Sequence, residues 1–159
     1  MISKYLSLEE CIKSPTAKRL GISNQPNIEQ LENMVYVATN VFDKVREFVG
    51  APLAASSFFR SKELNEAVPG SSKTSQHMTG EAIDIDCDVF NNSNNWEVFN
   101  FIKDNLNFDQ LILEYPGPTG KPSWVHVSLV QHPKTNRGQV LVKLKDKYIP
   151  FGEYKIGMI

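Results

Sequence analysis

The chain is poor in the residues that build disulfide-rich or cysteine-based metal domains. Its 159 residues include only two cysteines and three histidines. Two cysteines exclude a disulfide-dense scaffold and a zinc site made of four cysteines, and we expect Cys11 and Cys87 to be free thiols. Any tightly bound metal ion must therefore be held by histidine and carboxylate side chains.

An excess of charge and long apolar runs are also lacking. Seventeen lysines and arginines against eighteen aspartates and glutamates give a formal net charge of −1. This balance predicts no nucleic-acid partner. No apolar segment approaches the roughly 20 residues that span a bilayer, so no membrane insertion is expected. The start, MISKYLSLEE, lacks the apolar stretch of a signal peptide, and we expect synthesis in the cytoplasm.

The composition that remains fits one globular domain. Hydrophobic residues make up 41% of the chain and charged residues 22%, which is enough apolar surface for a core at this length. We expect a single domain over residues 1–159, acting as a monomer.

Helical periodicity is clearest over residues 28–49, where Asn27 and Gly50 are suitable caps. A second amphipathic helix is predicted over residues 95–105, and Ser7 with Glu10 forms a capping box that opens a short helix. Residues 14–26 are expected to be irregular because proline and glycine interrupt them.

The remaining apolar and alternating runs predict strands at residues 54–60, 82–87, 110–115, 123–130, 138–144 and 147–154. The last two are expected to form a closing hairpin. Helices followed by several antiparallel strands indicate an α+β fold, with a central antiparallel sheet and helices packed on one side.

Three polar residues form a candidate metal site. His77 lies in a predicted loop, while Asp84 and His126 lie on the less apolar faces of two predicted strands. Two imidazoles and one carboxylate leave a fourth tetrahedral position for water, which is typical of catalytic zinc. Asp86 shares the face of Asp84 and is an alternative ligand, and His126 could instead be an ordinary cross-strand neighbour.

Glu114 is the candidate general base. If the turn after residue 115 centres near Gly120, Glu114 pairs directly with His126 on the same face. A slip of one residue would turn Glu114 to the other face, leaving it a solvent-facing strand residue. His132 is interpreted as a loop residue outside the site.

The sequence Ser75-x-His77-x-x-Gly80-x-Ala82-x-Asp84, followed by Trp124-x-His126, resembles the zinc D-alanyl-D-alanine carboxypeptidase family, which has a hedgehog-like fold. Phe58-Phe59-Arg60-Ser61 with Asn65 and Gly70 resembles the family's approach to this motif. Ser14-Pro15-Thr16-Ala17 and Asn24-Gln25-Pro26 are similar to a smaller, often phage-associated branch. The resemblance covers roughly residues 5–132, and residues 133–159 would add closing strands.

The resemblance implies that His77, Asp84 and His126 bind Zn²⁺. It also implies that Arg60 steadies the tetrahedral intermediate, although Arg60 could instead be a structural ion-pair donor. Ser75 and Gln76 would lie beside the substrate's carboxylate. Trp124 is interpreted as a wall of the substrate cleft.

The position of the catalytic carboxylate departs from the better-known members. They carry it two or three residues before the second histidine, where this chain has Ser123 and Trp124. Asp109-Gln110-Leu111-Ile112-x-Glu114 resembles the equivalent run of the smaller branch, so the base is assigned to Glu114.

The function implied is zinc-dependent hydrolysis of peptidoglycan stem peptides, by a carboxypeptidase or an endolysin-type endopeptidase. A phage-encoded or virion-associated protein would need another route than a signal peptide to reach the cell wall. The alternative is a zinc-binding, catalytically silent module that recognises muropeptides in a phage tail or cell-wall assembly.

Overall fold

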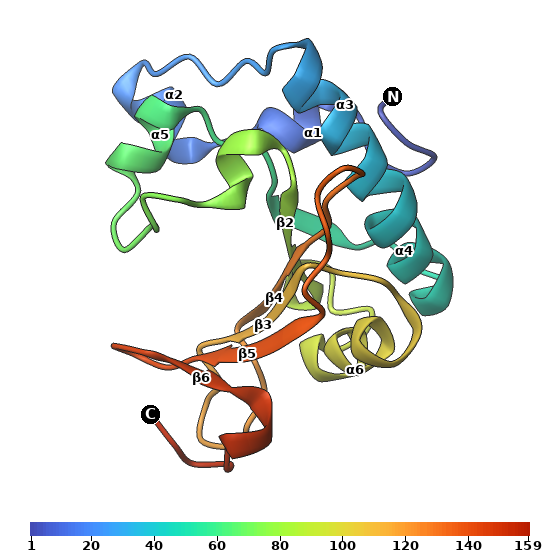
Figure 1. Ribbon diagram of the computed structural model, residues 1–159, viewed down its shortest axis with the longest axis vertical. Coiled ribbons are helices and arrows are strands. Elements are labelled where there is room, and N and C mark those ends of the chain that lie inside the picture. Colours follow the sequence, from blue (N-terminus) through green and yellow to red (C-terminus); the bar gives the residue numbers. More distant parts are fainter.

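The computed structural model describes residues 1–159 and is built around one six-stranded sheet (Figure 1). The strand order is β1-β2-β4-β3-β5-β6. The strands are β1 Ala54–Ser57, β2 Ala82–Asp86, β3 Gln110–Glu114, β4 Trp124–Ser128, β5 Gln139–Lys143 and β6 Tyr148–Pro150.

Six α-helices accompany the sheet: α1 Leu8–Ile12, α2 Pro15–Leu20, α3 Ile28–Val37, α4 Asp43–Val49, α5 Lys62–Ala67 and α6 Asn95–Asn105. Shorter helical segments are the π-helical η1 Ala38–Phe42 and the 3₁₀ turns η2 Gln76–Thr79, η3 Cys87–Val89 and η4 Phe151–Glu153. None of the helices is both long and apolar enough to cross a membrane.

The long helix predicted over residues 28–49 is confirmed as α3, η1 and α4 in succession. Asn27 caps its start in a capping box with Gln30, and Gly50 ends it in the left-handed conformation. The sequence did not indicate the π-helical turn in its middle. The helix at 95–105 and the short helix after Ser7 are also confirmed.

The prediction that residues 14–26 are irregular is wrong, because they contain α2. The residues interpreted as breakers serve as its ends instead. Ser14 caps the first turn, Pro15 occupies the first helical position where no backbone donor is needed, and Gly21 closes the helix with φ of 66°.

The α+β class is confirmed, but the expectation of a fully antiparallel sheet is wrong at one pairing. β3 and β5 run parallel, with Leu111 beside Val140 and Leu113 beside Val142. The other four pairings are antiparallel, including the closing hairpin of β5 and β6. The parallel pairing follows because the chain crosses back after β4 and re-enters the sheet next to β3.

One face of the sheet makes the main core. Alternate residues of β2, β3 and β4 are fully buried there against α3, η1, α4 and α6, which lie together on that side (Figure 1). The core also contains Cys11 and Cys87, which are confirmed as free thiols. Helices α2 and α5 lie apart from this layer, and the second face of β2, β3 and β4 is left for a cleft.

Candidate metal centre

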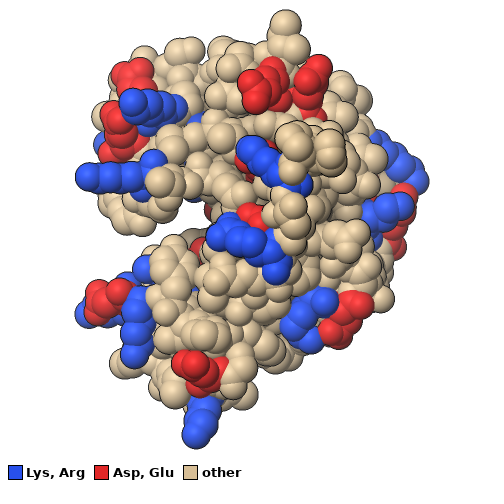
Figure 2. Space-filling model, viewed as in Figure 1, with Lys and Arg blue, Asp and Glu red and all other residues tan.

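A cleft of about 680 Å³ opens on the face of the sheet away from the core helices. Figure 2 shows its mouth as a notch between the surface over α2 and α5 and the surface over β5 and β6. All the residues predicted for the site line this cleft: Arg60, Ser75, Gln76, His77, Asp84, Glu114, Trp124 and His126.

His77 is held rigidly by the turn that carries it. The Ser75 hydroxyl accepts a hydrogen bond from the His77 backbone N–H and begins η2, and Gly80 ends it with φ of 77°. A side chain at Gly80 could not be accommodated, since its Cβ would lie 2.5 Å from the Gln30 carbonyl oxygen. This close approach gives a physical reason for the glycine in the motif.

Asp84 and His126 face each other across two neighbouring strands. They are direct partners in the antiparallel register of β2 and β4, and His126 Nδ1 lies 2.9 Å from Asp84 Oδ1. The same Asp84 oxygen lies 3.2 Å from His77 Nε2. One ligand atom from each of the three residues lies within 4.8 Å of the others.

The state of His77 fits a metal ligand. Its Nδ1 lies 2.6 Å from the Phe58 carbonyl oxygen, which can only accept, so Nδ1 carries the proton. Burial lowers the pKa of His77 and so favours the neutral ring, while the negative charge of Asp84 opposes this shift. A metal-bound histidine usually donates its other ring N–H to a carbonyl or carboxylate, as His77 Nδ1 does here to Phe58.

The surroundings of His77 Nε2 are the clearest sign that this site suits a cation. His77 Nε2 is buried and makes no hydrogen bond, although it lies 3.2 Å from a carboxylate oxygen. A lone pair and a carboxylate oxygen repel each other unless a cation lies between them. Ligands at zinc distances in a tetrahedron would be about 3.3 Å apart, close to the observed spacing. The three residues therefore fit zinc.

The carboxyl of Asp84 is in its ionised form. Burial opposes its ionisation, but the hydrogen bond with His126 helps to hold its pKa below the ordinary value. Asp86, the alternative ligand, does not join the group. It accepts hydrogen bonds from the Asp88 backbone and from Asn95.

Glu114 lies on the cleft face, but its predicted pairing is wrong by two residues. Its partner on β4 is Trp124, and His126 pairs with Ile112. A shift of two keeps the face unchanged, so Glu114 still points to the side of His126. Glu114 is 8% exposed. Burial raises its pKa to about 7, with Asp84 adding to the rise and His126 opposing it.

Arg60 enters the cleft beside the ligand turn. Its backbone N–H donates to the His77 carbonyl at 3.2 Å, and its Nε is buried without a hydrogen-bond partner. Burial lowers the pKa of Arg60, while the charges of Asp84 and Glu114 counteract that shift. It forms no ion pair, which disfavours a purely structural role.

Two of the other predicted residues already have partners within the protein. Gln76 donates from Nε2 to Asp109 at 3.0 Å. Trp124 packs at 5.3 Å against the ring of Tyr115. His132 does not line the cleft.

Residues 133–159 were expected only to add closing strands, yet this segment forms part of the cleft wall. Arg137 lines the cleft just before β5, Gln139 and Leu141 line it from β5, and Tyr148 lines it from β6. No motif marks these residues. The alternation of β5 could have placed Gln139 and Leu141 on one face, but only with the parallel pairing to β3 in hand.

Comparison with known proteins identifies one family. The family model described as Peptidase M15 matches residues 4–128. No curated protein sequence matches the chain. The matched region includes the three candidate ligands, Arg60 and Glu114, and it ends before the cleft-lining residues of β5 and β6.

Proposed function

The chain belongs to the peptidase M15 family, and from that premise we propose that it is a zinc-dependent hydrolase of peptidoglycan stem peptides. One observation carries the zinc part of the proposal. The buried, unpartnered Nε2 of His77 converges with Asp84 and His126 on one point of a cleft that also holds Glu114 and Arg60. The choice of stem peptides as substrate rests on the resemblance of the motif to peptidases of the cell wall.

His77, Asp84 and His126 would hold the zinc ion. Zinc in such a site lowers the pKa of water toward about 7 and polarises a carbonyl group.

Glu114 is the proposed general base and acid. It would take a proton from the attacking water and later deliver it to the leaving amine of the cleaved peptide. A pKa of about 7 suits both steps, because the carboxyl can then accept and return a proton near neutral pH. Burial in the cleft wall is the main cause of that value.

Arg60 is the proposed stabiliser of the negative charge that develops on the scissile carbonyl oxygen. Arg60 lines the cleft and forms no ion pair within the protein, so its guanidinium is not committed to another group. A hydrogen bond to a developing oxyanion in a partly buried site strengthens as charge accumulates there.

Purified sacculi test the proposal. The zinc-loaded protein is expected to release new amino groups and short peptides, which mass spectrometry identifies and assigns to a carboxypeptidase or an endopeptidase cut. The zinc-stripped protein and unrelated linear peptides are the matched controls. Binding to sacculi without any cleavage would favour the silent muropeptide-binding module, and equal cleavage of unrelated peptides would reject the cell-wall substrate.

A further inference from the structure

We propose that Arg137 is a specificity-determining residue that binds a carboxylate of the substrate in the cleft, which rests on the proposed peptidase function. Arg137 lies outside the family match and outside the catalytic groups described above. Its anchoring, its free donors and its place along the sheet all point to this role.

Asp109 fixes the position of the guanidinium. Arg137 donates from Nε to Asp109 Oδ1 at 2.9 Å and from Nη2 to Asp109 Oδ2 at 2.7 Å. The Arg137 backbone N–H donates to the same carboxylate at 2.9 Å. Asp109 is 4% exposed, and hydrogen bonds from Arg137 lower its pKa to about 2, so it stays ionised. The guanidinium is thus held in one orientation before any substrate binds.

The opposite edge of the guanidinium remains free. Arginine carries five N–H donors, and the edge formed by Nε and Nη2 is the one that Asp109 occupies. Nη1 makes no hydrogen bond, and the side chain is 55% exposed and lines the cleft. The edge formed by Nη1 and Nη2 has the fork geometry that binds a carboxylate through two parallel hydrogen bonds.

The charges of the cleft favour an anionic ligand. Its lining has three cationic side chains, Lys13, Arg60 and Arg137, against the two acidic side chains of Asp84 and Glu114. A bound zinc ion would offset the charge of Asp84, and burial raises the pKa of Glu114 to about 7, so part of this carboxyl stays neutral at neutral pH. Asp109 balances the charge of Arg137, so a substrate carboxylate would be attracted by Lys13 and Arg60 and oriented by the free donors of Arg137.

The strand register shows where Arg137 lies along the sheet relative to the metal centre. His126 pairs with Ile112, and Gln110 lies two residues further along β3, roughly 7 Å away. Asp109 directly precedes Gln110, and Gln139 pairs with Gln110 on β5. Arg137, whose backbone N–H donates to Asp109, thus lies toward the opposite end of β3 from Glu114.

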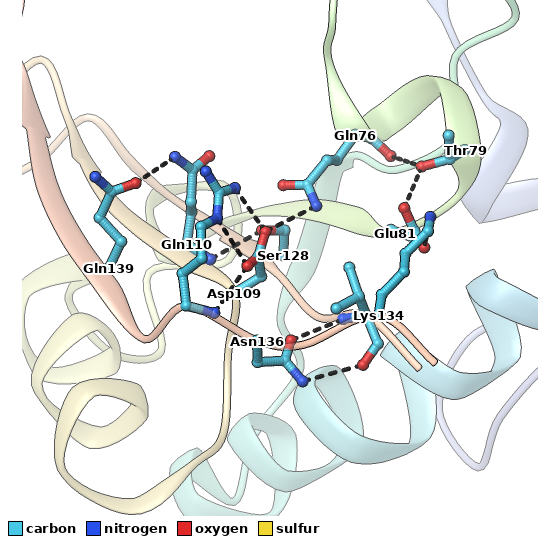
Figure 3. Close-up of polar contacts among 11 residues, drawn as sticks. Gln76, Thr79, Glu81, Asp109, Gln110, Ser128, Lys134, Asn136 and Gln139 are labelled. Carbon is cyan, nitrogen blue, oxygen red and sulfur yellow. Dashed lines mark hydrogen bonds and ion pairs between the residues drawn. The ribbon is translucent and has the colours of Figure 1, made fainter. Parts of the chain in front are cut away.

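Hydrogen bonds connect this end of the cleft to the metal centre. Gln76, which directly precedes His77, donates to Asp109 Oδ2, and Gln110 donates to Gln139 at 2.7 Å (Figure 3). Figure 3 shows Gln76 reaching from η2 toward the Asp109 carboxylate. The carboxylate-binding arginine and the ligand turn are therefore held in a fixed relation.

Peptide binding to the zinc-free full chain tests the proposal without catalysis. The probe is L-alanyl-γ-D-glutamyl-L-lysyl-D-alanyl-D-alanine, measured by calorimetry. One analogue has a C-terminal carboxamide, and a second has D-isoglutamine in place of D-glutamate. Wild type is expected to bind the acid at least about tenfold more tightly than one of the two analogues, since a charged, two-point contact is lost. The analogue that loses affinity identifies which carboxylate is bound.

Two variants separate recognition from folding. Arg137→Gln removes the guanidinium, but it leaves the buried Asp109 without its partner and could destabilise the fold. Arg137→Lys keeps a charge beside Asp109 and offers no second edge. Arg19→Gln, at an exposed arginine of α2 outside the cleft, is the matched control. Unfolding midpoints confirm that each variant is folded at the assay temperature.

The proposal requires that both Arg137 variants abolish the preference for the acid over the amide while Arg19→Gln retains it. Three results would overturn it. They are an acid preference that survives in Arg137→Lys, a variant that loses the same affinity for the acid and the amide, and a wild type that shows no preference. Cleavage of the same peptides by the zinc-loaded wild type is scored separately. No cleavage with an intact binding preference would reject the peptidase, and cleavage without a preference would reject only the role of Arg137.

Discussion

The two faces of β2, β3 and β4 differ sharply in polarity and burial. On one face Ile83, Ile85, Leu111, Leu113, Val125 and Val127 are all fully buried under the helices. On the other, Asp84, Ile112, Glu114, Trp124 and His126 line the cleft. Successive residues of one strand therefore alternate between packing in the core and lining the cleft, because side chains in a strand point to opposite faces.

This difference separates stability from chemistry at the scale of one residue. The core face is apolar and closely packed, so truncation there costs transfer free energy and leaves a cavity. The cleft face holds an unpartnered imidazole nitrogen, a carboxyl with a raised pKa and a buried guanidinium donor. Such groups lower the stability of the fold but can take part in a reaction. Substitutions on the core face should therefore change the free energy of unfolding, and substitutions on the cleft face should change kcat.

The largest expected effect is on the cleft face, at Glu114→Gln. Loss of a general base in proton transfer typically costs about 10²- to 10⁴-fold in rate. We expect kcat for stem-peptide hydrolysis to fall by that factor, with zinc content unchanged. A Glu114→Gln variant as active as wild type would move the base elsewhere, while the family assignment would stand.

The adjacent residue gives the opposite result. Leu113 is fully buried in the core, and Leu113→Ala is expected to lower the free energy of unfolding by about 2–5 kcal/mol. The folded fraction should keep its zinc and most of its kcat, because Leu113 points away from the cleft. Denaturant unfolding and the peptide assay on one preparation measure both quantities. A loss of kcat larger than the loss of stability would break the separation of the two faces.

The raised pKa of Glu114 predicts a pH dependence of stability in the metal-free protein. The folded state binds this proton more tightly than the unfolded chain, whose glutamate titrates near 4.5, so stability falls as pH rises from about 4.5 to about 7. The loss is at most about 3.5 kcal/mol, at about 1.4 kcal/mol per pKa unit. Above pH 7 the effect is constant.

Denaturant titrations of wild type and Glu114→Gln at a series of pH values isolate this contribution, since other groups cancel in the difference. As pH rises from about 4.5 to about 7, the free energy of unfolding of the variant should increase relative to that of wild type. Below pH 4.5 the difference between the two should not change with pH. A constant difference between the two proteins would mean that Glu114 is an ordinary carboxylate in the fold.

Much of the fold and the centre of the site could be predicted because they depend on local or periodic signals. Short stretches of sequence contain these signals. They include the caps Asn27 and Gly50, the alternation of β2 and β4, and the spacing of His77 and Asp84. Strand parity placed Asp84 and His126 on the face opposite the core, and the structure agrees.

The rest depends on distant pairings that no short window contains. The turn between β3 and β4 was expected to centre near Gly120, but the strands pair as Ile112 with His126, so the register was off by two. Glycines and prolines mark such a turn without fixing its centre. The β3–β5 pairing and the Asp109–Arg137 ion pair join residues far apart in sequence, which left the wall formed by residues 137–148 unpredicted.

The zinc content of the purified chain tests the central claim most directly. After dialysis against zinc and then buffer, wild type should retain about one zinc ion per chain, as expected for a three-ligand site. His77→Ala should retain almost none, and His126→Ala, at a less buried ligand, should repeat that loss. His132→Ala changes a histidine outside the cleft and should keep its zinc. A wild type without zinc, or a His77→Ala variant with as much zinc as wild type, would contradict the account.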